Sequence, residues 1–353
     1  EEPARCWPGG PWAALQGHRR CCTAETPEGC PPFAALVRLQ RPPGLELCLH
    51  RPEIAHDAVE EKVRTRREPY ECKLLWRLGD LLRPPRPERL QVLDVGASVG
   101  SCALALAAAL GADVVAVEPH PRTFALLNAS AWRLGARGLE GAGHVHALNV
   151  AASERARLGR LLEPGGNAGA SHAVGSEEEE AALDSGRLRV LSSGAGGIAG
   201  VGGAAFRRWP MQEQRLDDAL APPRQRPPLP RRRLDLLKVD AEGAELRVLR
   251  GLSRVLANAE WAPRAAKLEF HPQRLRSKGH DPLELLNWLL AHGYVIWVLR
   301  SASAEDLRGA CWIDDPAVAE RFVAEFAAVR VWTDILALAG TSSPELLSAL
   351  GGP

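Results

Sequence analysis

Two acidic residues and a glycine turn are spaced as in a site for a nucleoside cofactor. The apolar stretch LQVLDVGASVG ends with Asp94, Gly96 and Gly100, and the next apolar stretch, DVVAVE, ends with Glu118. In a doubly wound sheet, the carboxyl ends of neighbouring strands meet at the edge where ligands bind. A carboxylate there can accept hydrogen bonds from both ribose hydroxyls of an adenosine, and the N-terminus of the following helix favours a carboxylate or phosphate. The spacing therefore predicts an adenosine-containing cofactor.

The residues of the glycine turn and the strand ends could bind the cofactor in different ways. Gly96 would keep a side chain out of the ligand's path, and Gly100 would let the helix that starts near Ser98 approach closely. Asp94 could accept hydrogen bonds from loop amides or hold an ammonium group, and Asn149, at the end of the third strand, could contact the adenine. The residues that we expect to bind the cofactor are Asp94, Gly96, Ala97, Ser98, Gly100, Glu118, Pro119 and Asn149.

The glycine spacing distinguishes two classes of cofactor. A dinucleotide fingerprint requires G-x-G-x-x-G, and here Ser98 and Ser101 stand where its second and third glycines would be. This difference disfavours an NAD(P)-dependent oxidoreductase, which is the weaker alternative. The pattern D-x-G-x-x-x-G instead resembles the first motif of class I S-adenosylmethionine-dependent methyltransferases.

A second group of side chains follows two later apolar stretches. LDLLKVDAEGAE contains Asp240 and Glu242, and KLEFHP contains Glu269 and His271. Asp240 and Glu242 could orient an acceptor hydroxyl or remove its proton, although a helix-capping pair would have the same pattern. Either Glu269 or His271 could be a general base, since an unperturbed histidine has a pKa of about 6.5; otherwise His271 is a loop residue. The expected catalytic residues are Asp240, Glu242, His271 and Glu269.

Longer stretches resemble one enzyme family, the FkbM-type methyltransferases. The similarity lies in ELCLHRPEIAHDAVEEKVRTRREPYECKLL (46–75), VVAVEPHPRTFALLNAS (114–130), RLDDAL (215–220) and LDLLKVDAEGAELRVLRGL (234–252). The family signature K-[IV]-D-x-E-G-x-E is matched by Lys238, Val239, Asp240, Glu242, Gly243 and Glu245. The resemblance covers residues 45–340, loosely at 163–205. It implies a class I methyltransferase fold, S-adenosyl-L-methionine as cofactor, and O-methylation of a hydroxyl on a sugar, glycan or small metabolite.

The same resemblance suggests roles for a few more positions. The family carries an acid near the cofactor at the position of Glu71, next to Tyr70, although a glutamate in a first helical turn needs no such explanation. Asn167 and Gly169 resemble an Asn-Gly element that lies over the acceptor. Glu245 falls in the first turn of the next helix, where the helix dipole favours acids, so we expect a structural role for it.

An alternation of apolar strands and helical segments must position these residues. Buried parallel strands are expected at 90–95, 113–118, 144–150, 234–240, 265–270 and 294–299, with a last strand at 329–338. Three- and four-residue apolar spacing predicts helices at 54–82, 98–111, 121–135, 243–257 and 281–292. The pattern predicts an α/β fold with a doubly wound, mostly parallel seven-stranded sheet and helices on both faces.

Several segments lack the composition of a core. We expect residues 1–44 to form an irregular Pro/Cys-rich arm and 45–340 to form the methyltransferase domain, with a flexible insertion at 163–205, a Pro/Arg-rich linker at 221–233 and a C-terminal tail at 341–353. The linker contains RQRPPLPRRR, which matches the polyproline motifs that SH3 domains bind. An SH3-type partner at 224–232 would make the chain a non-catalytic interaction protein on a methyltransferase fold. A plain linker is the other interpretation.

Composition limits the remaining classes of protein. The 353 residues have a formal net charge of +1 and no interleaving of basic and aromatic residues, so no nucleic acid is expected as a partner. No apolar run has the length of a membrane span. The eight cysteines include no CxxC pair, so we expect no metal site.

The compartment stays open between the cytoplasm and the secretory lumen. The chain begins at Glu1 and Met211 is its only methionine, so a preceding segment, such as a targeting sequence, is expected. The early cysteines could form disulfides in a lumen or be free thiols in the cytosol. These cysteines are Cys6, Cys21, Cys22 and Cys30.

Overall fold

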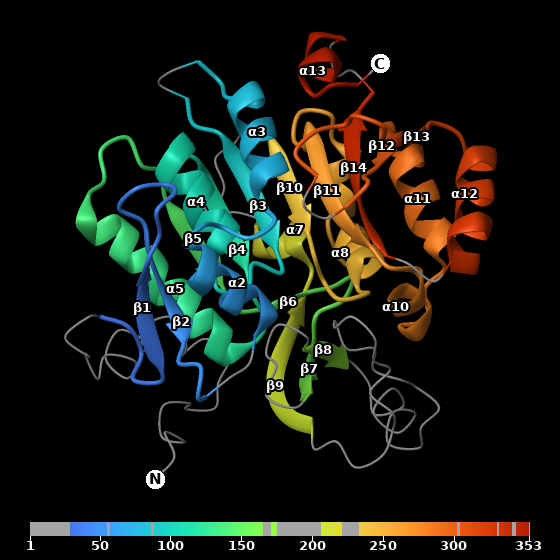
Figure 1. Ribbon diagram of the computed structural model, residues 1–353. Coiled ribbons are helices and arrows are strands. Elements are labelled where there is room, and N and C mark those ends of the chain that lie inside the picture. Colours follow the sequence, from blue (N-terminus) through green and yellow to red (C-terminus); the bar gives the residue numbers. More distant parts are fainter. Residues whose placement is uncertain are drawn as a thin grey trace.

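Eight strands form the central sheet, in the order β13-β12-β14-β11-β10-β3-β4-β5 (Figure 1). The computed structural model describes residues 29–352 apart from 55–56, 86–87, 165–170, 175–205, 221–232, 302–303, 330–331 and 341–343. The strands are β3 (Gln91–Val95), β4 (Asp113–Val117), β5 (Val145–Leu148), β10 (Leu236–Val239), β11 (Ala265–Phe270), β12 (Tyr294–Val298), β13 (Cys311–Ile313) and β14 (Thr333–Ala339). The five strands from β11 to β5 run parallel, whereas β14 is antiparallel to both β11 and β12.

The side chains of the central strands alternate between two apolar layers. In β3, Val92 belongs to one buried cluster and Leu93 to the other, and Leu236 and Leu237 of β10 divide in the same way. Because successive side chains of a strand point to opposite faces, both faces of this sheet need a cover. The predicted doubly wound α/β fold is confirmed.

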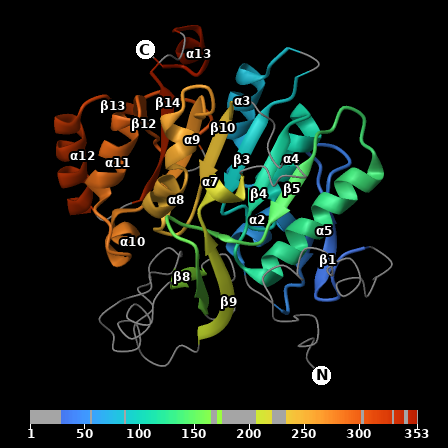
Figure 2. The same cartoon turned by 180° about the vertical axis from the view of Figure 1, so that it is seen from behind.

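Helices cover the two faces in separate groups, which Figures 1 and 2 show from opposite sides. One apolar cluster contains residues of α2 (Ala58–Arg66), α3 (Lys73–Leu82), α4 (Ser101–Leu110), α5 (Pro121–Arg137) and α13 (Pro344–Ala349). The other contains residues of α7 (Leu216–Ala219), α8 (Glu245–Gly251), α9 (Ser253–Ala257), α10 (Pro272–Ser277), α11 (Pro282–Ala291) and α12 (Pro316–Val329). The sheet is therefore the middle layer of three.

Two smaller sheets lie outside the central one. β1 (Ala34–Arg38) and β2 (Glu46–His50) form an antiparallel pair. β6 (Ala151–Ala152), β7 (Arg157–Pro164), β8 (His172–Val174) and β9 (Phe206–Gln214) form a four-stranded sheet in the order β6-β9-β7-β8. In Figure 1, β7, β8 and β9 lie below the lower ends of the parallel strands, which are their carboxyl ends.

The structure corrects the predicted elements in a few places. The central sheet has eight strands rather than seven, because β13 is an edge strand of three residues, too short to be recognised from its pattern. The helix expected over 54–82 is divided into α2 and α3, with Arg67 in the left-handed region at the end of α2. β1 lies inside the segment expected to be an irregular arm, β8 inside the expected insertion, and α13 inside the expected tail. Each of these elements is short, so its periodic signal is weak.

Disulfides join two pairs of cysteines, Cys30–Cys48 and Cys72–Cys102. Cys311 is a free, exposed thiol. Cys6, Cys21 and Cys22, which could form disulfides or be free thiols, lie outside the described residues. In the part of the chain that the structure describes, no helix combines the length and apolar character required to cross a membrane.

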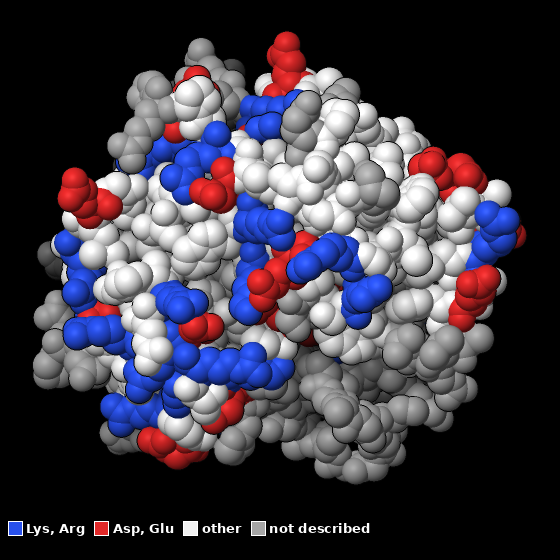
Figure 3. Space-filling view, turned by 45° about the horizontal axis from the view of Figure 1, so that its top comes forward, with Lys and Arg blue, Asp and Glu red and all other residues white. Residues whose placement is uncertain are grey.

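Charged side chains of both signs are present on the face shown in Figure 3. Basic side chains gather on the side where β1, β2 and α2 lie in Figure 1, and acidic side chains stand among them. Several of the exposed charges form ion pairs, such as Lys73 with Glu305 and Arg83 with Asp80. This face therefore presents mixed charges rather than a field of a single sign.

Candidate functional site

The glycine turn after β3 is fixed by close backbone packing. Gly96 has a φ of 76°, and a Cβ atom at this position would lie 1.8 Å from the backbone oxygen of Asp240. The backbone N–H groups of Gly96 and Ala97 both donate to the carbonyl of Val117, at 2.9 and 3.0 Å. Glycine is therefore required by the approach of β10, whereas the sequence suggested only that it kept a ligand's path free.

The turn continues in an unusual backbone conformation. Ser98 has a φ of 50°, in the left-handed region that a residue with a side chain rarely adopts. Gly100, with a φ of 81°, is the N-cap of α4, which begins at Ser101 rather than near Ser98 as expected. A Cβ on Gly100 would lie 2.4 Å from Cδ1 of Leu127 in α5, so this glycine lets α5 approach the turn. Strained backbone of this kind often accompanies functional sites.

Glu118 lies directly against this turn. Its carboxylate accepts hydrogen bonds from the backbone N–H of Ser98 at 2.9 Å and of His120 at 2.8 Å. Burial raises the pKa of Glu118 to about 7. Asn149 donates from Nδ2 to the carbonyls of Glu118 and Pro119, so it braces the loop that carries the acid. The expected contacts of Glu118 with a ribose and of Asn149 with an adenine remain predictions.

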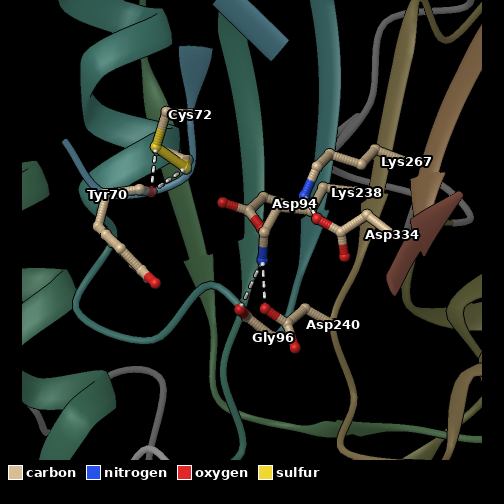
Figure 4. Close-up of a disulfide and its surroundings, with 9 residues drawn as sticks. Tyr70, Cys72, Asp94, Gly96, Lys238, Asp240, Lys267 and Asp334 are labelled. Atoms are coloured by element: carbon tan, nitrogen blue, oxygen red, sulfur yellow. Dashed lines mark hydrogen bonds and ion pairs between the residues drawn. A yellow bond between two sulfur atoms is a disulfide. The ribbon is translucent and has the colours of Figure 1, made fainter. Parts of the chain in front are cut away.

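A buried lysine links the ends of β3 and β10. Nζ of Lys238 donates to the carbonyl of Gly96 at 3.1 Å, and it lies 3.3 Å from Oδ1 of Asp94 and 3.5 Å from Oδ2 of Asp240 (Figure 4). Burial alone would lower the pKa of Lys238, but the charges of Asp94 and Asp240 raise it above its usual value. Among the described residues, Oδ2 of the buried Asp94 has no hydrogen-bond partner. This oxygen is free to accept a bond from a ligand.

Asp240 differs from the other acids of the site in its exposure. Its side chain is 41% exposed, whereas that of Asp94 is 2% exposed. The carboxylate of Asp240 can therefore meet a molecule from solution while Lys238 compensates its charge at the base of the site.

A second buried ion pair lies beside this group. Lys267 of β11 pairs with Asp334 of β14, and both side chains are buried. Figure 4 shows this pair on one side of Lys238 and the segment of Tyr70 and Cys72 on the other. We did not predict either residue of the pair. A lysine inside the apolar stretch AAKLEF was the available signal, because a buried lysine requires a partner.

Arg274 holds two of the expected catalytic acids. Its Nη1 lies 2.6 Å from Oε2 of Glu242 and donates to both carboxylate oxygens of Glu269 at 2.9 Å. Burial raises the pKa of Glu242 to about 8, and Glu242 has a φ of 54°. Sequence reasoning missed Arg274, which lies in the first turn of α10. It was one of two arginines in PQRLRSK, and nothing in the pattern distinguished it from Arg276.

His271 and Glu245 stabilise the ends of helices. Nδ1 of His271 accepts from the backbone N–H of Arg274 as the N-cap of α10, and burial lowers the pKa of His271 to about 4. Glu245 accepts from the backbone N–H of Ala241 and Gly243, at 3.0 and 3.1 Å. The structural role expected of Glu245 agrees with these bonds. The geometry of His271 fits a cap better than a general base.

Glu71 belongs to the same charged group. Burial and the charges of Asp334 and Asp240 raise the pKa of Glu71, whereas Tyr70 and Lys267 lower it. Asn167 and Gly169, expected over the acceptor, lie outside the described residues, as does the segment 224–232. In the described ranges, no three His, Cys, Asp or Glu side chains group as metal ligands.

The family assignment follows from a comparison with protein-family models. Residues 94–296, more than half of the chain, match the model described as the methyltransferase FkbM domain. The sheet order, with one antiparallel strand between β11 and β12, is that of a class I methyltransferase fold. The chain therefore belongs to the FkbM methyltransferase family. A search of the curated proteins gives no match.

Solved structures give only weak likenesses. An FkbM methyltransferase from Methylobacillus flagellatus KT is 14% identical, with a TM-score of 0.38, over 71% of this chain and 43% of that one. A precorrin-6y C5,15-methyltransferase from Geobacter metallireducens GS-15 is 13% identical, with a TM-score of 0.32, over 74% of this chain and 84% of that one. This chain thus spans less than half the length of the first of these proteins. TM-scores this low add nothing to the family assignment.

Proposed function

We propose that this protein transfers a methyl group from S-adenosylmethionine to a hydroxyl of a sugar, glycan or small metabolite. The observation that supports it best is the grouping of Asp94, Glu118 and Asp240 around one glycine turn, at the carboxyl ends of β3, β4 and β10. In open α/β sheets, ligands bind at this edge. The family supports methyl transfer, and the hydroxyl acceptor is the finer part of the proposal.

The chain's own groups fit an S-adenosyl ligand. The buried, unpartnered Oδ2 of Asp94 can accept from the ammonium group of the ligand's amino-acid end. Each carboxylate oxygen of Glu118 already accepts one backbone N–H and keeps further capacity to accept from ribose hydroxyls. When bound, S-adenosylmethionine supplies an electrophilic methyl group with its leaving group already attached.

The remaining work of the protein is to position and deprotonate the acceptor. Direct displacement needs the acceptor oxygen about 3–3.5 Å from the methyl carbon and in line with the bond that breaks. Asp240 is the acid best placed to hold the hydroxyl and take its proton, because it is exposed while Lys238 anchors it. Glu242 and Glu269 are bound to Arg274, so they shape the wall of the site instead.

Titration calorimetry tests the cofactor part of the proposal. Wild type should bind S-adenosylmethionine, and Asp94→Asn and Glu118→Gln should each weaken binding by about ten-fold, roughly the value of one hydrogen bond to a charged group. Glu140→Gln is the matched control, since Glu140 is an exposed acid away from the turn. A folded wild type that shows no binding would refute the proposal.

Replacing Asp240 tests the chemistry. Asp240→Asn should lower the rate of methyl transfer to hydroxyl acceptors by about 10²- to 10⁴-fold, the range of general base catalysis. The affinity of this variant for S-adenosylhomocysteine should stay within about three-fold of the wild-type value, because Asp240 acts on the acceptor and not on the cofactor. Transfer of a labelled methyl group to a panel of glycans and metabolites supplies the rate. An unchanged rate would remove Asp240 from this role.

A further inference from the structure

The segment between α2 and α3 forms a side of the site and has little secondary structure of its own. Tyr70 and Glu71 lie here, and Glu71 has a φ of 54°, which costs about 1 kcal/mol or more in a residue with a side chain. No N–H or C=O group of residues 68–71 forms a hydrogen bond with the backbone of another described residue. Something other than a hydrogen-bond ladder must hold this segment in place.

The Cys72–Cys102 disulfide is placed to do so. Cys72 is the N-cap of α3, directly after Glu71, and Cys102 lies in the first turn of α4, two residues after Gly100 of the glycine turn. Both cysteines are buried. The bond therefore ties the Tyr70–Glu71 segment to the helix that begins at the proposed cofactor site.

The sulfur atoms also contact the segment directly. Sγ of Cys72 and Sγ of Cys102 lie 2.9 and 3.4 Å from the carbonyl oxygen of Tyr70 (Figure 4). Glu71 follows Tyr70 directly, and the charges of Lys267, Asp334 and Asp240 act on the pKa of its carboxyl group. The disulfide thus fixes the segment at Tyr70 and Cys72, on either side of Glu71.

We propose that the Cys72–Cys102 disulfide is a positioning element that holds Tyr70 and Glu71 against the site, so that binding of an S-adenosyl ligand depends on the oxidised form. This inference rests on the proposed function. Reduction by a dithiol breaks the sulfur–sulfur bond, gives two cysteine thiols and leaves the dithiol as its own disulfide. If reduction leaves the segment in place in about one molecule in ten, the apparent Kd rises about ten-fold.

The second disulfide provides a matched control. Cys30–Cys48 joins the start of the described chain to β2 and is bonded to no part of the segment of Tyr70 and Glu71. A Cys30→Ala/Cys48→Ala variant keeps only the bond near the site, and a Cys72→Ala/Cys102→Ala variant keeps only the remote bond. Calorimetry with S-adenosylhomocysteine, with and without dithiothreitol, compares the two variants with wild type.

The expected pattern is specific to the positioning role. The variant that lacks Cys30 and Cys48 should bind as wild type when oxidised and lose about ten-fold in affinity on reduction. The variant that lacks Cys72 and Cys102 should bind weakly under both conditions. Glu71→Gln should lower the affinity of the oxidised protein for S-adenosylhomocysteine. In the variant without Cys72 and Cys102 it should cause no further loss of affinity, because the disulfide acts through Glu71.

Three results would overturn the proposal. The first is wild-type affinity for S-adenosylhomocysteine in a folded Cys72→Ala/Cys102→Ala protein. The second is an equal effect of Glu71→Gln in the proteins with and without Cys72 and Cys102. The third is an affinity of the Cys30→Ala/Cys48→Ala protein that does not change on complete reduction. If the variant without Cys72 and Cys102 does not fold, the reduction experiment decides, with circular dichroism confirming an intact fold.

Hydrogen exchange separates this inference from the proposed function. Loss of the Cys72–Cys102 bond should speed exchange of the Trp76 amide, which donates to the carbonyl of Cys72 at the end of this segment, by about ten-fold or more. Should oxidised wild type not bind S-adenosylhomocysteine, the proposed function fails, and the exchange rates still decide whether the bond orders this segment. Equal exchange rates in both variants would show that it does not.

Discussion

The buried ammonium group of Lys238 links the charges at the ends of β3 and β10. Lys238 contacts the carbonyl of Gly96 and the carboxylates of Asp94 and Asp240, which come from two different strands. Without it, the buried Asp94 would face Asp240 with no positive charge between them. The lysine of the family signature is therefore explained here by the electrostatics of the strand ends.

Removing this charge should destabilise the fold. Lys238→Met leaves the buried carboxylate of Asp94 uncompensated, which should lower the free energy of unfolding by about 3 kcal/mol. Urea denaturation measures the change. The double variant Lys238→Met/Asp94→Asn should recover part of the loss, since it also removes the orphaned charge. Equal stability of Lys238→Met and wild type would contradict this account of Lys238.

The buried carboxyl of Glu118 should make ligand binding depend on pH. Its pKa is raised to about 7 by burial, and only the ionised form accepts from both ribose hydroxyls. The ionised fraction falls as the pH drops through 7, so affinity for S-adenosylhomocysteine should fall about ten-fold between pH 8 and pH 6. Calorimetry at the two pH values measures this change. Glu118→Gln should bind weakly with a flatter pH profile, and an unchanged profile would assign the titration to another group.

At the scale of elements, the turn between β3 and α4 depends on the packing of strand ends. A side chain at Gly96 would collide with the backbone of Asp240, whereas Gly138, with a φ of 56° at the end of α5, has no atom within 4 Å of its Cβ position. Both glycines have left-handed backbone, so they differ mainly in the collision. The pair therefore isolates the effect of close approach.

Alanine at these two positions should have unequal effects. Gly138→Ala should cost about 1 kcal/mol, from backbone strain alone. Gly96→Ala should cost more than about 4 kcal/mol, because β3 and β10 must move apart. Thermal and urea unfolding provide both values. If the two variants were equally stable, the close approach of β10 would not be the reason for glycine at position 96.

The elements that could be predicted from sequence are those with strong local signals. The seven apolar stretches became β3, β4, β5, β10, β11, β12 and β14, because strands covered on both faces are nearly continuous apolar runs whether they run parallel or, as β14 does, antiparallel. β13 and β8 were missed, since three residues give no periodicity. Asp94, Glu118 and Asp240 were found because they end such strands. Lys267, Asp334 and Arg274 are brought to the site by pairings that no local pattern encodes.

On the scale of the whole molecule, Glu163 links the four-stranded sheet to the site. Glu163 of β7 accepts from Nε1 of Trp209 at 2.6 Å and lies 3.1 Å from Nε2 of His120. His120 follows Pro119, and its backbone N–H donates to Glu118. The sheet formed by β6, β7, β8 and β9 thus contacts the loop that carries the proposed ribose acid.

Weakening this link should loosen the connection between the two sheets. Glu163→Gln replaces a charged acceptor with a neutral one and should lower the free energy of unfolding by about 1–2 kcal/mol. Glu140→Gln, at an exposed position, should change it by less than about 0.5 kcal/mol. Urea unfolding curves of the two variants test the difference. A loss no larger for Glu163→Gln than for the control would show that the link carries no stability.

The central claim is that an S-adenosyl ligand binds across the ends of β3 and β4, and a crystal structure with S-adenosylhomocysteine tests it most directly. The account predicts ribose hydroxyls within hydrogen-bond distance of Glu118 and the ammonium group at Asp94. Density for the ligand elsewhere, or contacts with neither acid, would contradict it.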